Sequence, residues 1–261
     1  MIKDDGIVCK ISGQHFIATT TTGGAAKVLS DMEEYAQTEW PHLNVYLNSI
    51  TEQFSTFNIS GPKSRAIMRK VFSNIDFSNE KFPFMSFKKV NYLDTQVRIL
   101  RASFTGELGY EVYISPKYGL ELWEKFFRYG ENLGLIPYGT ETMHLLRAEK
   151  GYIVVGQDTD GTVTPLDLNL NWMIGRNKKD FIGKRSLSRS DTSRRGRKQL
   201  VGILAVDKSK IIEEGQHVVE KSSIPAKIKF PVKYLGHITS SYHSPTLNYY
   251  VAMAMIEGGN E

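Results

Sequence analysis

Residues 101–111 have the sequence Arg101-Ala-Ser-Phe-Thr-Gly-Glu-Leu-Gly-Tyr-Glu111, which predicts two strands joined by a tight turn. Apolar and polar residues alternate on both sides of the turn, as they do in strands that bury one face. Gly106 and Gly109 permit the reversal because glycine adopts backbone conformations closed to other residues. The hairpin therefore carries a carboxylate, Glu111, on its second strand.

A second informative segment comprises Leu146-Arg-Ala-Glu-Lys-Gly151 and Val155-Gly-Gln-Asp-Thr-Asp-Gly-Thr-Val-Thr-Pro165. It predicts a helix end that carries Arg147, followed by a polar, glycine-rich loop. A carboxylate on a strand and a guanidinium on a helix suit a polar heterocycle with an anionic tail. Taken singly, Glu111 and Arg147 are more typical of surface charges, so the prediction depends on the pair.

Length and composition set the protein class. With 261 residues the chain can bury a sizeable core in one to three modules. No apolar run approaches membrane-spanning length, and the first residues lack the pattern of a signal peptide. Cys9 is the single cysteine, so no internal disulfide can form, and we expect a buried thiol in the reducing cytoplasm.

The net charge of +5 is concentrated in one stretch. Residues 176–198 contain ten Lys or Arg and two Asp, a balance of +8 that leaves −3 for the remainder. This stretch is either a solvated linker or a surface for an acidic ligand tail or a partner protein. We expect no nucleic acid, because Phe181 is the single aromatic residue in this stretch and no nucleic-acid motif is present.

Hydrophobic patterning predicts a mixed α+β chain. Residues 53–134 have the order β-α-β-β-α, close to a split βαβ unit. A hairpin and a helix precede this unit, another helix follows at 140–149, and residues 176–199 have linker composition. In all, the predicted strands lie at 7–11, 16–20, 43–50, 53–60, 96–104, 109–115, 199–206, 227–234, 236–241 and 249–255, the last four forming a small barrel or sandwich.

The spacing of the candidate ligand residues argues against calcium, other metal and dinucleotide sites. Asp158-Thr-Asp160-Gly161 resembles a calcium loop, but its glycine comes two positions early and the closing glutamate is missing. The six histidines show no ligand spacing, so we predict no metal. The dinucleotide-binding glycine motif is also missing. Asp4 and Asp5 are either a general acid–base pair or an exposed acidic terminus.

Together the two segments resemble the folate-binding aminomethyltransferase superfamily, in particular the C-terminal folate module of heterotetrameric sarcosine oxidase α subunits. The run from Pro137 to Pro165 is long and specific. Matching pieces extend along the whole chain: Asp4-Asp-Gly6, Thr19-Thr-Thr-Thr-Gly-Gly-Ala-Ala26, Gln37-Thr-Glu-Trp-Pro41, Phe82-Pro-Phe-Met85, residues 103–111 and 137–165, Asp180-Phe-Ile-Gly-Lys-Arg185 and Leu235-Gly-His-Ile-Thr-Ser-Ser-Tyr242.

The resemblance implies a three-lobed ring around tetrahydrofolate, with two α+β lobes, one of them ferredoxin-like, and a small C-terminal β-barrel. By this resemblance, residues 1–50 and 138–195 form the first α+β lobe, 51–137 the ferredoxin-like lobe, and 196–261 an incomplete barrel. Family modules have more chain before the first strand and after the last. The resemblance therefore also implies truncation at both ends.

The resemblance also assigns roles to individual residues of this sequence, each at a position that matches a site residue of the family. Asp5 matches the family's catalytic aspartate. Among the residues that bind the folate, Glu111 matches the glutamate that bonds the pterin ring. The other matching folate-site positions are Arg147, which supports the site, Phe104 beside the pterin, Thr19 with a backbone contact, and Trp172, to which we assign less weight.

The function implied by the resemblance is one-carbon transfer. Tetrahydrofolate accepts the one-carbon unit of an oxidised N-methyl amine such as sarcosine, forming 5,10-methylenetetrahydrofolate. Flavin and NAD would then reside in partner domains or subunits, and flavoprotein subunits would be the partners. The alternatives are the aminomethyltransferase (T-protein) of glycine cleavage and a non-catalytic folate-binding or assembly module.

Overall fold

The computed structural model describes residues 1–220 and 231–259 and divides into two compact units. One unit is Gly6–Leu146; the other combines Met1–Asp5 with Arg147–Glu261. The helices are α1 (Ala25–Thr38), α2 (Ser64–Val71), α3 (Gly119–Gly130), α4 (Thr140–Lys150) and α5 (Ser190–Ser193). The strands are β1 (Val8–Lys10), β2 (Phe16–Ala18), β3 (Ser55–Ser60), β4 (Ser86–Tyr92), β5 (Thr95–Arg101), β6 (Gly109–Ile114), β7 (Lys198–Leu204), β8 (His217–Val218), β9 (Gly236–Ser244) and β10 (Tyr249–Glu257).

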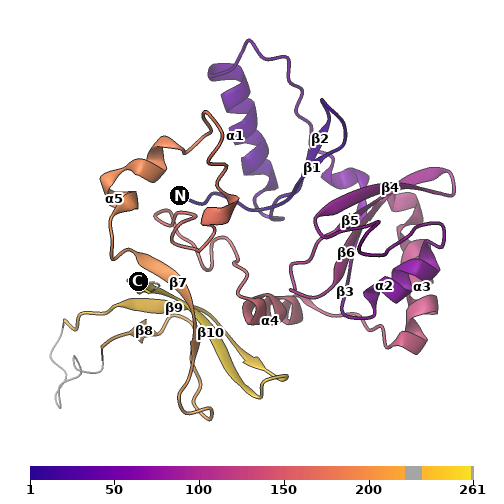
Figure 1. Ribbon diagram of the computed structural model, residues 1–261. Helices are drawn as coiled ribbons and strands as arrows, with labels where there is room; N and C mark the ends of the chain where they lie inside the picture. Colours follow the sequence, from indigo (N-terminus) through magenta and orange to yellow (C-terminus); the bar gives the residue numbers. More distant parts are fainter. Residues whose placement is uncertain (221–230, 260–261) are drawn as a thin grey trace. The chain divides into compact units, whose positions relative to one another are not determined.

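The Gly6–Leu146 unit is built on an antiparallel sheet of order β3-β6-β5-β4. Because β3 and β5 are both antiparallel to β6, they run in the same direction with β6 between them, as in a split βαβ unit. Helices α2 and α3 lie beside this sheet in Figure 1. Strand β4 pairs with β5 at the edge of the sheet and was not predicted from the sequence.

Alternation along β6 gives the sheet two different faces. Tyr110, Val112 and Ile114 are fully buried in the cluster that α2 and α3 cover. Burial of each such large apolar side chain stabilises the fold by about 1.5–3 kcal/mol. Glu111 and Tyr113 face the other way, where Tyr113 packs in a small cluster around Cys9 of β1, Leu100 and Ala102. The prediction that Cys9 is buried is confirmed.

The predicted strand at 43–50 is wrong, because residues 44–50 have no regular structure. The side chains of Leu43, Val45 and Tyr46 are 52%, 53% and 85% exposed, so the apolar alternation there does not mark a buried face. Without a buried face or a strand to pair with, alternation alone does not stabilise a strand. The neighbouring prediction at 53–60 is confirmed by β3.

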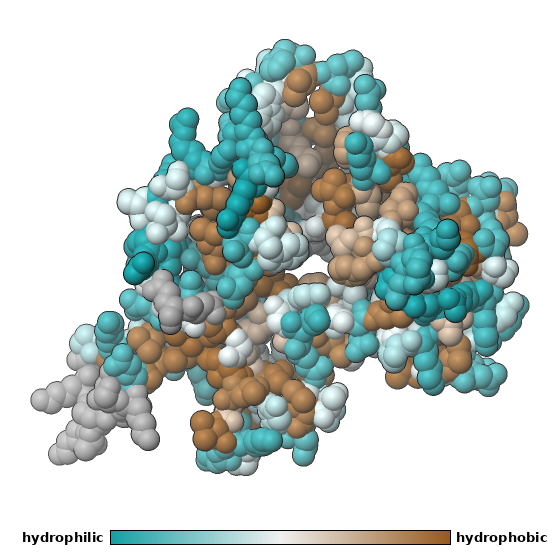
Figure 2. Space-filling view, viewed as in Figure 1, coloured by the Kyte–Doolittle hydropathy of each residue, from teal (hydrophilic) through white to brown (hydrophobic). Residues whose placement is uncertain are grey.

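The other unit contains a second antiparallel sheet, of order β7-β10-β9-β8. The sheet is curled (orange to yellow in Figure 1), and hydrophobic residues gather over it in Figure 2. The pairing of β9 with β10 shifts between Met253 and Ala254, which leaves Thr239 as the extra residue of a β-bulge. Of the strand predicted at 227–234, residues 227–230 lie outside the described residues and 231–234 are not a strand.

The mixed α+β class predicted from the sequence is confirmed, with several antiparallel sheets and a curled C-terminal sheet. The division into three lobes stays a prediction, since the structure separates two units. Across residues 1–220 and 231–259, the helices are all too short or too polar to cross a bilayer.

Candidate functional site

Glu111 lies on the face of the β3-β6-β5-β4 sheet that is opposite α2 and α3, and polar side chains surround it. The phenol of Tyr113, two residues further along β6, donates a hydrogen bond of 2.5 Å to Oε2 of Glu111. Oε1 accepts no hydrogen bond from any residue that the structure describes. The half-buried carboxylate therefore keeps acceptor capacity, because an ionised carboxylate offers about four lone-pair sites.

Side chains on the strands beside β6 determine the surroundings of the Glu111 carboxylate. Asn58 of β3 lies opposite Glu111 in the register, and its Oδ1 accepts hydrogen bonds from Ser60 and from the Tyr138 phenol. Burial, followed by the charge of Glu111, raises the pKa of the Cys9 thiol. Cys9 therefore remains a neutral thiol beside the carboxylate, and it is poorly suited to act as a nucleophile.

The turn before β6 holds Phe104, which is half-buried. Gly106 has a φ of 77°, in the left-handed region that glycine favours. A Cβ at Gly109 would lie 2.8 Å from the carbonyl oxygen of Ala102, so the chain can approach itself this closely only at glycine. The conformational role inferred from the sequence is confirmed for Gly106, whereas Gly109 is required for close packing and not for a left-handed conformation.

Thr19 lies just after β2 and extends the β1–β2 hairpin. Its backbone N–H donates to the carbonyl of Ile7 (2.9 Å), and its hydroxyl oxygen accepts from the Ile7 N–H (3.0 Å). A Cβ at Gly6 would lie only 1.9 Å from the carbonyl oxygen of Thr19, so glycine is required there. Because the Thr19 N–H donates within the hairpin, the Thr19 carbonyl is the backbone group that remains to accept a hydrogen bond from a ligand.

Asp5 ends the short N-terminal segment of the other unit. The segment is tied down by a hydrogen bond from the Ile2 N–H to the Val163 carbonyl (2.9 Å). The Asp5 side chain has exposed surface, yet its surroundings desolvate the carboxylate. This desolvation and then the charge of Asp4 raise the pKa of Asp5 above the ordinary value, although its backbone hydrogen bond acts in the opposite direction.

Arg147, at the end of α4, is completely buried and pairs with Asp158. Its Nη1 lies 2.5 Å from Oδ2 of Asp158, and it also donates to the Tyr152 carbonyl (3.1 Å). Nη2 donates to the side chains of Gln157 (3.1 Å) and Ser240 (2.8 Å). Within the described residues its Nε has no partner. Arg147 therefore ties α4 to the following loop and to β9, rather than presenting a free guanidinium.

The β-bulge in β9 supplies two further hydrogen-bond donors to the Asp158 carboxylate. The hydroxyls of Thr239 and Ser240 each donate to Oδ1 of Asp158, both at 2.6 Å. Successive residues of a regular strand point to opposite faces, so two adjacent hydroxyls reach one carboxylate only because the bulge interrupts the alternation. The Val154 N–H donates to Oδ2 (2.8 Å). A buried charge pair is tolerated when its remaining hydrogen-bonding groups are satisfied in this way.

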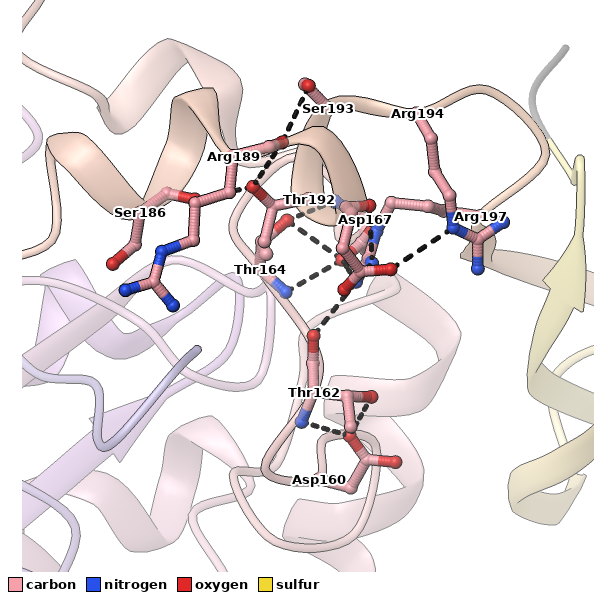
Figure 3. Close-up of polar contacts among 11 residues, drawn as sticks. Asp160, Thr162, Thr164, Asp167, Ser186, Arg189, Thr192, Ser193, Arg194 and Arg197 are labelled. Atoms are coloured by element: carbon pink, nitrogen blue, oxygen red, sulfur yellow. Dashed lines mark hydrogen bonds and ion pairs between the residues drawn. The ribbon is translucent and has the colours of Figure 1, made fainter.

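A second ion pair joins the end of the basic stretch to a carboxylate that precedes it in the sequence. Arg197 binds Asp167 bidentately, with Nε to Oδ1 and Nη2 to Oδ2 both at 2.8 Å, and also bonds Asp191 and the Thr162 carbonyl (Figure 3). Burial by itself raises the pKa of Asp167, but the Arg197 pair and the Thr164 hydrogen bonds lower it below the ordinary value. At its C-terminal end the stretch is therefore fixed in place, which a solvated linker does not require.

Trp172 lies in a short 3₁₀ helix, Asn171–Met173, and its side chain is 76% exposed. A shallow, open depression lies beside it, lined by Asn171, Trp172, Ile174, Gly175, Arg176, Asn177 and Lys178. This depression joins one aromatic ring to two cationic side chains, which suits an acidic ligand or partner.

The predicted site residues divide evenly between the units. Thr19, Phe104 and Glu111 belong to Gly6–Leu146, whereas Asp5, Arg147 and Trp172 belong to the other unit. Their roles toward a ligand stay predictions. Sequence reasoning missed two residues beside them.

The first missed residue is Tyr113, whose signal was its place two positions after Glu111 on the same strand face. The second is Asp158, whose calcium-like loop instead contains a buried ion pair with Arg147. Neither residue has a motif of its own, so only the predicted strand period and the rejected loop could have pointed to them.

Comparison with family models gives two matches. The GCVT N-terminal domain matches residues 1–178, and the glycine cleavage T-protein C-terminal barrel domain matches residues 198–261. A solved structure, the glycine cleavage system aminomethyltransferase T from Bartonella henselae, has the same fold. Its TM-score is 0.79 at 22% identity, covering 98% of this chain and 64% of that one.

Curated relatives fall into two groups. The chain is 46% identical to the sarcosine oxidase subunit alpha of Corynebacterium sp. (strain P-1) and 35% identical to that of Rhizobium meliloti, in each case over 99% of its length. It spans only 27% and 26% of those relatives. It is also 31% identical to an aminomethyltransferase of Thermosipho melanesiensis, over 98% of this chain and 64% of that protein. With both domain models matched along its length, this chain belongs to the glycine cleavage T-protein family.

Proposed function

We propose that this chain is a tetrahydrofolate-binding module that receives a one-carbon unit from an oxidised N-methyl amine. The observation that carries the proposal is the 46% identity to a sarcosine oxidase subunit alpha, which extends over 99% of the chain. The matched region includes Glu111 and Asp5, the two carboxylates to which the chemistry is assigned. The methylated amine that fits this relative's name is sarcosine.

Glu111 is suited to the pterin ring. A pterin presents neighbouring N–H donors on its aminopyrimidinone edge, and a carboxylate accepts such a pair with two parallel hydrogen bonds. Glu111 is half-buried, with Oε1 free of partners among the described residues and Oε2 using one acceptor site for Tyr113. Its acceptor capacity therefore fits this donor pair.

Asp5 is assigned the proton transfer. When bound, tetrahydrofolate supplies the two amine nitrogens that take up the one-carbon unit as 5,10-methylenetetrahydrofolate. Transfer to an amine requires a group that accepts and returns a proton, and such a group works best when its pKa lies closer to neutral pH. The raised pKa of Asp5 moves it in this direction.

The other predicted residues have supporting roles. Phe104 packs beside the ligand from the hairpin turn, and Thr19 offers its backbone carbonyl. Arg147 acts indirectly, because its hydrogen bonds are made within the protein and fix the loop up to Asp158. Trp172 and the neighbouring cations suit an acidic portion of the ligand or a partner.

The remaining chemistry is assigned to other parts of the enzyme. Oxidation of the N-methyl group needs a flavin, which we place with NAD in partner domains or flavoprotein subunits. Two relatives are named as subunits, which supports an assembly of several chains. The lone, unpaired Cys9 is consistent with a reducing cytoplasm.

The second candidate function is that of an aminomethyltransferase of glycine cleavage. It is favoured by the 31% identity to the Thermosipho melanesiensis protein over 98% of the chain. A third possibility, a non-catalytic folate-binding module, would keep Glu111 useful while making Asp5 dispensable.

Reconstitution separates these functions. The chain is combined with sarcosine-oxidising flavoprotein subunits, and formation of 5,10-methylenetetrahydrofolate from sarcosine is measured in parallel with transfer from an aminomethylated lipoyl protein. Product from sarcosine supports the proposal, whereas product from the lipoyl protein alone supports the second candidate. Folate binding without product in either assay supports the third.

A further inference from the structure

We infer that Tyr113 is a positioning residue that orients the Glu111 carboxylate for its ligand. This inference rests on the proposed function and names a residue that the family resemblance did not supply. Tyr113 and Glu111 occupy the same face of β6, and their side chains are joined by the 2.5 Å hydrogen bond from the phenol to Oε2.

The ring of Tyr113 is held from several sides. It packs against the cluster of Cys9, Leu100 and Ala102 and makes an edge contact with Phe54, with ring centroids 6.4 Å apart. Arg98, opposite Tyr113 in the β5–β6 register, lies over Phe54 at 4.4 Å from the ring centre. Because the ring is held, the direction of its hydroxyl is fixed, and so is the oxygen of Glu111 that it binds.

The phenol remains a donor at physiological pH. Burial, followed by the charge of Glu111 and the hydrogen bond to it, raises the pKa of Tyr113 far above the ordinary tyrosine value. A phenol that does not ionise is a fixed donor, so the carboxylate keeps one orientation. An acceptor held in advance of binding avoids the cost of ordering it when the ligand arrives.

Tyr113→Phe tests this role. Removal of the hydroxyl should weaken tetrahydrofolate binding by the full chain about tenfold in calorimetry, since hydrogen bonds to charged groups fall in this range. The matched control is Tyr92→Phe. The Tyr92 phenol also donates to a glutamate, Glu121, at 3.0 Å, but its ring lies in the core that α2 and α3 cover. We expect Tyr92→Phe to leave the affinity unchanged.

A double-mutant cycle separates positioning from a general structural effect. If Tyr113 acts through Glu111, Tyr113→Phe should change the remaining affinity less than about twofold in a Glu111→Gln background. An equal loss in both backgrounds would overturn the inference, as would wild-type affinity in Tyr113→Phe alone.

A ligand-free readout keeps this inference distinct from the proposed function. In ¹³C spectra of tyrosine-labelled chain without ligand, the ring resonance missing from Tyr113→Phe should keep its neutral-phenol position at a pH where exposed tyrosines ionise, and it should shift in Glu111→Gln because its hydrogen-bond acceptor is changed. A resonance that Glu111→Gln leaves unmoved would overturn the Tyr113–Glu111 contact. A wild-type chain that binds no tetrahydrofolate would contradict the proposed function, and the positioning role with it.

Discussion

Arg147 and Asp158 form a completely buried ion pair, with Nη1 and Oδ2 2.5 Å apart. The residues are 11 positions apart, and Ser240 of β9 bonds to both of them. This arrangement joins the last turn of α4, the following loop and the bulged strand.

Removal of one partner should therefore be costly. Asp158→Ala leaves a buried, uncompensated guanidinium, and we expect the free energy of unfolding to fall by about 3–5 kcal/mol, measured by denaturant unfolding. The exposed pair of Lys117 and Asp94 provides the control, because Asp94→Asn should have little effect. Equal losses in the two variants would contradict the structural role of the buried pair.

The Asp167–Arg197 pair predicts an acid-dependent loss of stability. The folded-state pKa of Asp167 is depressed, so its contribution is fully present above the unfolded value of about 3.9 and disappears as pH falls through the folded pKa. Unfolding curves between pH 7 and pH 2 should show this slope. Asp167→Asn should reduce it, and Arg197→Lys should weaken the bidentate pair. An unchanged slope in Asp167→Asn would assign the acid sensitivity elsewhere.

Two strand glycines of the same sheet should respond differently to alanine. A Cβ at Gly236 of β9 would lie 1.9 Å from the Met255 carbonyl oxygen, whereas a Cβ at Gly202 of β7 meets nothing within 4 Å. We expect Gly236→Ala to destabilise the fold by about 1–3 kcal/mol or more, because the paired strand must shift. Gly202→Ala should be neutral or slightly stabilising. Thermal unfolding of both variants checks the contrast, and similar midpoints would refute the register of β9 with β10.

Asp5→Asn separates catalysis from binding. If Asp5 transfers a proton, one-carbon transfer in the reconstituted enzyme should fall about 10²–10⁴-fold while tetrahydrofolate affinity changes little. Asp4→Asn should move the acidic limb of the pH–rate profile to lower pH, because the charge of Asp4 raises the pKa of Asp5. Full turnover by Asp5→Asn would assign the proton transfer to another group.

Local patterns predicted the parts of the fold that local forces determine. The hairpin around Gly106 and Gly109 follows from strand alternation and from glycine geometry, and the structure contains both strands. The helices beginning near Ala25 and Thr140 were predicted in the same way. Strand β4 was missed, because a half-buried edge strand has a weak alternation.

Long-range contacts were beyond the sequence pattern. The Arg147 network depends on Thr239 and Ser240, which are about 80 residues from Asp158, and on a bulge that alternation does not reveal. The basic stretch had the composition of a linker, yet Arg197 bonds to a carboxylate 30 residues earlier. Composition gives the charge of such a segment, while only the fold determines which charge is paired.

We assign Glu111 to a tetrahydrofolate site. Calorimetric titration of the purified chain with tetrahydrofolate, run beside Glu111→Ala and Tyr92→Phe, decides this assignment. We predict micromolar binding by the wild-type chain and by Tyr92→Phe, and its loss in Glu111→Ala while the variant remains folded by circular dichroism. Equal binding by Glu111→Ala and wild type would contradict the assignment, and the ligand of this carboxylate would then have to be sought elsewhere.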